Sequence, residues 1–449
     1  MLEEIFSAGA CEIRNLCDPS NWKVLVAVLS VHAAADAACI GFGIPPPRSD
    51  NLTEFDLVYV TVANHRLARD GSLSRFDPNL IRVLPKLRTP QVGISLRSLS
   101  HHLSTHHSEV DVKWLMQEGM VPERERTVNM LIYPAPFHLE NTDFQPVAGP
   151  LQYLNHREFG FFKFEPRERL NSAHLESVLA QAQRQTGRVH GLVLPECAVH
   201  EDDLALLKRL AVKHRIGFVV AGLRKERANE AFTGVQYLGK WRESSQPKHH
   251  RWCLDGHQIR NYELTPVLHP DVRWWEDIAI PKRYLNFITA NGWLTVSNLV
   301  CEDLARQDPV LQLLRGVGPT LVVALLLDGP QLKGRWPAQY AGVLADDPGC
   351  SVLTVTPLGM ALRSRPPGEK PSRVVGYWKD GQLGARQLEL AEDAEALVLT
   401  ISADDCVEEW TADGRTDAGT STQLVFGGLQ QIRTKQSRGP KRQRAQHSS

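Results

Sequence analysis

The feature that most restricts the fold is an alternation of short apolar runs and helix-like segments that begins at residue 127. The apolar runs, which predict buried strands, cover residues 128–133, 190–194, 217–223, 233–238, 293–300, 320–327, 351–356 and 396–401. Residues 171–186, 201–214, 302 onward and 336–345 predict helices. In 171–186, for example, apolar residues recur on one face. This pattern predicts an α/β fold with buried strands.

The same pattern divides the chain of 449 residues into three regions. Residues 1–125 are less regular and rich in Arg, His and Pro, so we predict an N-terminal accessory region there. Residues 126–405 carry the alternation and predict the α/β domain. Residues 406–449 are polar, and 433–444 contain six basic residues and no acidic one, so we expect a disordered tail.

Charge and cysteine usage narrow the class of protein. Lys plus Arg equals Asp plus Glu, at 51 each, so we expect nucleic acid to bind at most weakly, through the basic tail. The eight cysteines form no short-spaced framework, which predicts reduced thiols in the cytoplasm. The longest apolar stretch, 24–40, is interrupted by His32 and Asp36 and is short for a membrane span, so we expect no membrane association.

Three short motifs carry candidate chemistry. In the run GLVLPEC, an apolar strand brings Glu196 to its carboxyl end, where active sites of α/β sheets lie. In QPKHHRW, Lys248 follows a polar loop and precedes two histidines. In NLVCEDLAR, Cys301 ends a strand and opens a helix, a position that we expect to face a cleft and backbone N–H groups. Taken singly, each motif also fits a surface loop or a core cysteine.

Together the three motifs resemble those of the nitrilase (carbon–nitrogen hydrolase) superfamily. Its members share a strand ending in Pro-Glu, a later Lys closely followed by His, and a Cys after an apolar strand, often followed by an acidic pair. These occur here in the same order, as Glu196, Lys248 and Cys301. The resemblance covers about residues 127–402. It implies a nitrilase-like α-β-β-α sandwich, here with an additional N-terminal region, and a Glu-Lys-Cys triad.

A second glutamate and the spacing of the motifs leave alternatives open. Many members of the superfamily place another glutamate after the Lys, near an aromatic residue, and Glu276 in RWWE fits; a Trp-rich surface segment is the alternative. The 52 residues between Lys248 and Cys301 are many for the family and contain an insert, 251–283. Arg260 and Lys282 therefore compete with Lys248, which alone has the Lys-His signature.

The resemblance implies hydrolysis of a non-peptide carbon–nitrogen bond of an amide-type substrate. In the chemistry that these residue types permit, Glu196 takes the proton of the Cys301 thiol as it attacks a carbonyl or nitrile carbon, and Lys248 with the backbone N–H of Glu302 stabilises the oxyanion. A thioester forms, and water or another amine resolves it. Glu276 positions the leaving nitrogen or the water. This chemistry requires no metal or organic cofactor.

The alternative prediction is a nitrilase-like module that binds a ligand or a protein partner. It would belong to a multicomponent bacterial system linked to a reverse transcriptase or to defence, and the large N-terminal region and the insert favour it. For the hydrolase we expect a small-molecule amide-type substrate, a homo-oligomer (dimer or larger) and a protein partner of the N-terminal region.

Overall fold

The computed structural model of the chain describes residues 2–7, 15, 18–38, 110–116, 125–147, 158–237, 240–281, 283–291, 293–306, 310–346, 349–365, 370–381, 384–407 and 420–434. Near the N-terminus it contains helices α1 (Leu2–Ser7) and α3 (Trp22–Ala38), which contact each other, and a 3-10 turn (Pro19–Asn21). In these described segments, no helix combines the length and apolarity that a membrane span requires.

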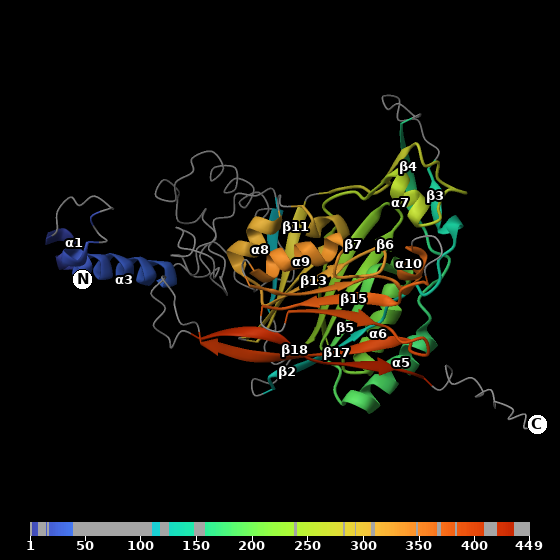
Figure 1. Cartoon of the computed structure of the whole chain (residues 1–449). Coiled ribbons are helices and arrows are strands. Elements are labelled where there is room, and N and C mark those ends of the chain that lie inside the picture. The colour runs from blue at the N-terminus through green and yellow to red at the C-terminus, as the bar shows by residue number, and fades with distance from the viewer. Residues whose placement is uncertain are drawn as a thin grey trace, which may run out of the picture.

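Two seven-stranded mixed sheets form the centre of the molecule (Figure 1). The strand order of the first sheet is β1 (Val110–Met116), β11 (Arg283–Asn291), β12 (Leu294–Val300), β13 (Leu321–Leu325), β14 (Ser351–Val355), β15 (Val374–Lys379) and β16 (Ala385–Glu389). The order of the second is β18 (Thr420–Ile432), β17 (Ala396–Val407), β2 (Thr127–Ile132), β5 (Gly191–His200), β6 (Phe218–Lys225), β7 (Ala228–Tyr237) and β8 (Lys240–Pro247).

The sheets face each other, and helices cover their outer faces. β11 contacts β8 and β12 contacts β7 across the interface. α5 (Ser172–Thr186) and α6 (Leu204–Lys213) cover the second sheet, whereas α8 (Gln312–Val317), α9 (Trp336–Asp346) and α10 (Leu358–Arg363) lie along the first. The predicted α/β class and the α-β-β-α sandwich are therefore confirmed.

Side-chain alternation explains why β2 fits between these layers. Val128, Met130 and Ile132 belong to the buried cluster between the two sheets, whereas Leu131 belongs to the cluster under α5. On α5, Leu175, Val178, Leu179 and Ala182 are all fully buried in that second cluster, which confirms the predicted helix face. Both faces of the second sheet are thus covered by apolar side chains.

A small third sheet lies at one end of the molecule (Figure 1). Its strand order is β3 (Phe144–Pro146), β4 (Phe159–Phe164), β10 (Arg273–Glu276) and β9 (Cys253–Leu254). The predicted insert supplies β9, β10 and the short α7 (Gly256–Asn261). Trp252, Tyr262 and Phe162 pack edge to face within a separate buried cluster, so the insert is a folded unit.

The structure differs from the predicted boundaries at both ends of the domain. Val110–Met116, assigned to the accessory region, pairs in parallel with Arg283–Asn291 as an edge strand. Thr420–Ile432, assigned to the disordered tail, pairs along the whole of Ala396–Val407. The tail prediction is therefore wrong for this strand, whose backbone hydrogen bonds outweigh its polar composition. Residues 39–109, which make up most of the predicted accessory region, lie outside the described residues.

The segment after Cys301 also differs from the predicted secondary structure. All eight predicted strands overlap observed strands, and the helices predicted at 171–186, 201–214 and 336–345 are present. The helix predicted from residue 302 is instead a 3-10 helix of four residues, Cys301–Leu304. A regular helix follows only at Gln312–Val317.

Candidate active site

Glu196 is aimed inward by an irregularity in its strand. β5 and β6 pair regularly up to Leu194 and resume at Val199, with a register shift between. Gly222 on β6 permits this close approach, because a Cβ atom there would lie 2.3 Å from the Pro195 carbonyl oxygen and 2.4 Å from the Glu196 Cα. The shift directs the Glu196 side chain into a site where it is fully buried.

Lys248 lies directly after the edge strand β8, and two carboxylates hold its ammonium group. Its Nζ lies 2.8 Å from Oε1 of Glu196 and 2.7 Å from Oε2 of Glu276. All three residues are buried, at 1%, 0% and 4% exposure respectively. The structure thus brings together three of the four predicted site residues. Of the alternatives, the exposed Arg260 donates to the Gly256 carbonyl instead, and Lys282 lies outside the described residues.

Asn229 is a site residue that the sequence did not reveal. Its amide nitrogen donates to Oε1 of Glu196 at 2.7 Å and to Oε1 of Glu276 at 2.8 Å. It therefore holds the two carboxylates in place beside Lys248, as a positioning residue. A lone Asn at the beginning of β7 has no neighbouring motif, so no local pattern signals this role.

Cys301 lies at the carboxyl end of β12, in a left-handed backbone conformation with φ of 46°. This confirms the predicted strand-to-helix elbow but not its exposure, because Cys301 is only 2% exposed and belongs to the core between the sheets. Its thiol makes no hydrogen bond to Glu196 or Lys248, although the charges of both act on it. Cys197, Cys253, Cys301 and Cys350 are free thiols.

Asp303 connects the loop that follows Lys248 to the Cys301 turn through hydrogen bonds. Its two carboxylate oxygens accept the backbone N–H of His249 at 3.1 and 3.0 Å, and Oδ1 lies 3.0 Å from Nδ1 of His250. Asp303 is itself buried. The acidic pair after the thiol was part of the motif, and the structure shows that its second member fixes the distance between the two loops.

Burial and neighbouring charges shift the proton affinities of the site. Burial opposes protonation of Lys248, but Glu196 and Glu276 outweigh it and raise the pKa of Lys248 well above 10.5. Burial, together with the Glu276 charge, raises the pKa of Glu196 above 4.5 despite the opposing effect of Lys248. Burial and Glu196 raise the pKa of the Cys301 thiol well above 9.0. The resting site therefore contains an ammonium group, a neutral thiol and a carboxyl group of increased basicity.

The Oε2 atom of Glu196 is buried without a hydrogen-bond partner. Its other oxygen, Oε1, accepts from both Lys248 and Asn229. An unsatisfied carboxylate oxygen in a buried site is costly and is free to accept a proton. No group of three or more His, Cys, Asp or Glu side chains with metal-binding geometry occurs among the described residues.

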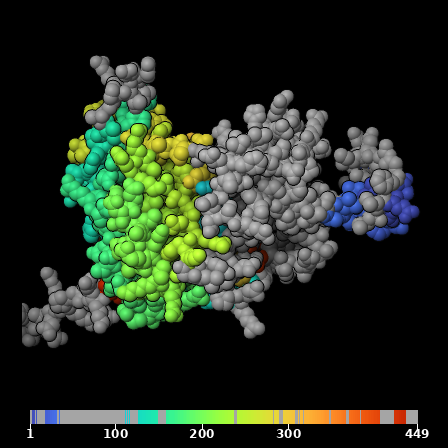
Figure 2. Space-filling view, turned by 180° about the vertical axis from the view of Figure 1, so that it is seen from behind, coloured from blue at the N-terminus to red at the C-terminus, as the bar shows by residue number. Residues whose placement is uncertain are grey.

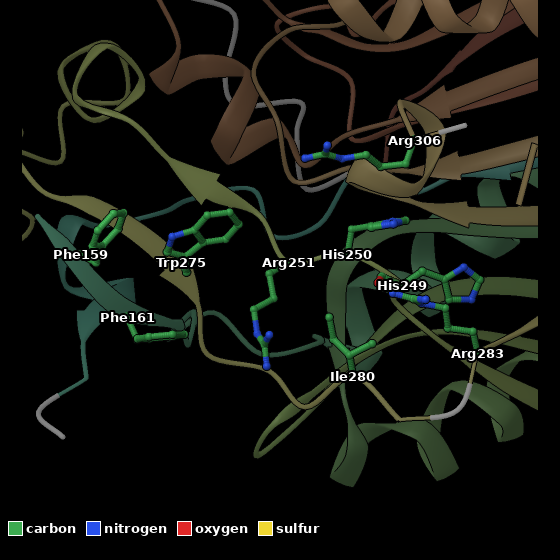
Figure 3. A pocket seen from close by; sticks show the side chains of 9 residues that line it. All are labelled: Phe159, Phe161, His249, His250, Arg251, Trp275, Ile280, Arg283 and Arg306. Carbon is green, nitrogen blue, oxygen red and sulfur yellow. Dashed lines mark hydrogen bonds between the residues drawn. The ribbon is translucent and has the colours of Figure 1, made fainter. Parts of the chain in front are cut away.

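The small sheet and its insert lie over this centre. Cys197, the neighbour of Glu196, packs with Trp252 and Leu327 in the buried cluster of that layer. The Trp252 backbone N–H also donates to Oε2 of Glu276 at 3.2 Å. Among the coloured residues, the teal to yellow-green part of the chain forms most of the surface seen from behind the view of Figure 1 (Figure 2). A cavity lined in part by His249, His250 and Trp275 lies beside the centre (Figure 3), and none of the four predicted site residues lines it.

No protein-family model and no curated protein matches the chain. Solved structures with a similar fold include a carbon–nitrogen hydrolase from Helicobacter pylori, with 12% identity and a TM-score of 0.37 over 61% of this chain and 89% of that one. Saccharomyces cerevisiae Nit3 is 12% identical, with a TM-score of 0.38 over 62% of this chain and 90% of that one. A Nesterenkonia amidase is 14% identical, with a TM-score of 0.35 over 60% of this chain and 90% of that one.

Nit3 and the amidase are members of the nitrilase superfamily. At these identities and TM-scores, the similarity concerns the course of the chain and carries no information on substrate or mechanism.

Proposed function

We propose that the chain is a cysteine-dependent hydrolase that cleaves a non-peptide carbon–nitrogen bond of an amide-type substrate. The observation that supports this most is the buried Lys248 ammonium group held between Glu196 and Glu276, at 2.8 and 2.7 Å, beside the Cys301 turn. Burying three ionisable side chains is costly, and a scaffold gains nothing from it that apolar residues would not supply. Such groups are typical of sites that move protons.

In the proposed reaction, the Cys301 sulfur attacks the carbonyl carbon of the amide. Its raised pKa keeps the thiol neutral in the resting state, so attack requires that a base take the proton as the C–S bond forms. Glu196 is that base, because Oε2 has no hydrogen-bond partner and its pKa is raised toward neutrality.

The negative charge that develops on the substrate oxygen requires donors. An ammonium group has three N–H bonds, and Lys248 uses two of them on Glu196 and Glu276. The third remains for the oxyanion, and the backbone N–H of Glu302 is the second proposed donor. One such donor typically contributes about 3 kcal/mol to stabilisation of the transition state.

Collapse of the tetrahedral intermediate breaks the C–N bond. Glu196 returns its proton to the leaving nitrogen, which departs as ammonia or an amine, and the acyl group stays on Cys301 as a thioester. Water then attacks the thioester, with its proton passing to Glu196, and the acid leaves as the thiol reforms. Glu276, held by Lys248 and Asn229, is placed to orient the leaving nitrogen or the water.

The test is release of ammonia from a panel of small aliphatic and aromatic amides. We expect the Cys301→Ala variant to lose release entirely, whereas Cys253→Ala, which alters a half-buried thiol of the small sheet, retains the wild-type rate. Circular dichroism confirms that both variants fold. Release by Cys301→Ala at the wild-type rate contradicts the proposal.

The homo-oligomer, the protein partner of the N-terminal region and the cytoplasmic location stay predictions.

A further inference from the structure

A cavity of about 550 Å³ lies beside the catalytic centre and has two chemically different sides. Phe159, Phe161 and Trp275 lie at one side, and His250 and Arg306 lie at the other, with Arg251 between them (Figure 3). None of the side chains that line it is a carboxylate. Aromatic rings offer stacking surfaces, and guanidinium groups recognise oxyanions, so the lining combines the two.

Arg251 is held in place, but no carboxylate among the described residues balances its charge. Its Nε and Nη2 atoms donate to the Ile278 carbonyl oxygen at 3.1 and 2.8 Å. Within the part of the chain that the structure describes, it forms no ion pair. A guanidinium group fixed by a carbonyl keeps its charge and loses little conformational entropy when an anion binds.

Two other side chains of the lining have acidic neighbours. His250 pairs with Asp303 at 3.0 Å, and Nε of the half-exposed Arg306 lies 3.9 Å from Oε2 of Glu302. Arg283, which also lines the cavity, donates to the His249 carbonyl oxygen at 3.4 Å. Arg251 lies between the two sides of the cavity, where its guanidinium group is placed to meet an anion.

This cavity is separate from the Cys301 centre. Successive residues of a strand point to opposite faces, so Trp275 and Glu276 on β10 face opposite ways. Glu276 contacts Lys248, whereas Trp275 lines the cavity. The two sites thus lie on opposite faces of the same strand.

We propose that this cavity binds a small organic anion in which a carboxylate or phosphate group is attached to an aromatic ring. The oxyanion contacts the Arg251 guanidinium, and the ring stacks against the side formed by Phe161 and Trp275. The inference is independent of the reaction at Cys301, because it uses none of the catalytic residues.

Isothermal titration of the full chain with phenyl phosphate, benzoate and the neutral benzyl alcohol tests the proposal. We expect saturable binding of at least one aryl anion and none of benzyl alcohol. The stronger of the two anions identifies the oxyanion that the site prefers. Inorganic phosphate, which lacks the ring, binds more weakly than phenyl phosphate.

Variants assign the binding to this cavity. Arg251→Gln removes a charged hydrogen-bond donor and weakens binding of the aryl anion about 10- to 100-fold. Phe161→Leu removes a stacking surface and weakens it about 2- to 10-fold. Arg184→Gln, which alters an exposed arginine on α5 that bonds only Gln181, leaves it unchanged.

A Cys301→Ala variant separates this site from the catalytic centre, and we expect it to bind the anion as the wild type does. Equal binding by Arg251→Gln and wild type, or no saturable binding of either anion, overturns the proposal. If sedimentation shows that Arg251→Gln instead dissociates an oligomer that binds no anion, the cavity is an interface between copies of the chain and the proposal is wrong.

Discussion

At the scale of single residues, the central feature is a lysine between two glutamates. The Lys248 ammonium group lies 2.8 Å from Glu196 and 2.7 Å from Glu276 and pairs with both buried side chains. The pKa of Glu196 is still raised, since burial and the second carboxylate outweigh the lysine. A carboxyl group in this state is a more effective base near neutral pH than an exposed one.

The first prediction concerns the pH dependence of kcat/KM. Deprotonated Glu196 is the active form, so activity rises with pH through its raised pKa, above 4.5. No alkaline decline occurs below pH 10.5, because the pKa of Lys248 is raised above that value. A rise centred instead above pH 9.0, in the range of the Cys301 thiol, would show that free thiolate forms without Glu196 and would contradict the assignment.

Asn229 provides a second prediction at this scale. Its hydrogen bond lowers the pKa of Glu196, so Asn229→Leu, similar in volume but without a donor, shifts the acidic limb of the pH profile to higher pH. The variant also lowers kcat about 10-fold or more, because two charge-assisted hydrogen bonds disappear. A lower kcat with an unmoved acidic limb contradicts the role given to Asn229.

Much of this site could be predicted from local motifs, and the rest could not. Glu196 follows Pro, Lys248 precedes His, and Cys301 precedes an acidic pair, so each has neighbours that signal it. Asn229 has none, because its role arises from the pairing of β7 with β6 and β8. The exposure of Cys301 was mispredicted because its burial depends on the core between the two sheets, which joins distant segments of the chain.

At the scale of elements, the site depends on close packing of β6 against the irregular end of β5. A Cβ on Gly222 would meet backbone atoms of Pro195, Glu196 and Cys197 at 2.3 to 2.5 Å, and backbone cannot move aside as a side chain can. This links the conformation of one glycine to the position of the proposed catalytic carboxylate of Glu196.

Gly222→Ala is therefore expected to lower the free energy of unfolding by about 3 kcal/mol and to reduce turnover further than this loss explains. The matched control is Gly342→Ala on α9, where a Cβ has nothing within 4 Å and alanine favours the helix. Urea unfolding and ammonia release measure both effects. Equal stability of the two variants contradicts the packing argument.

Element prediction succeeded where periodicity was strong. α5 and α9 were predicted because their apolar positions repeat at helical spacing, whereas strands of the small sheet were not. Phe159–Phe164 and Arg273–Glu276 are short and mixed in polarity, and their pairing joins segments more than a hundred residues apart. Such pairs have no signature within either segment.

At the scale of the whole molecule, each large sheet has one edge strand from outside the predicted domain, β1 in the first sheet and β18 in the second. β18 pairs with β17 over its full length, and β17 in turn pairs with β2, which lies beside the Glu196 strand. The polar composition of 420–434 concealed this strand, because a partly exposed edge strand needs few apolar residues.

Truncation tests whether the folded domain extends to the end of β18. Ending the chain after residue 407 removes β18 and exposes the unpaired edge of β17, so we expect a lower midpoint of thermal unfolding and aggregation. Ending it after Thr434 retains the strand and is the matched control, with unchanged unfolding. Equal unfolding midpoints of the two truncated chains mean that β18 contributes nothing to the fold.

The most direct test of the catalytic centre is mass spectrometry of the Cys301 peptide after acid quenching during turnover of an amide substrate. The account predicts an acyl group on Cys301 whose mass matches the substrate acid minus water, and no such adduct on Cys253. Turnover in which Cys301 stays unmodified and another residue carries the acyl group would contradict it.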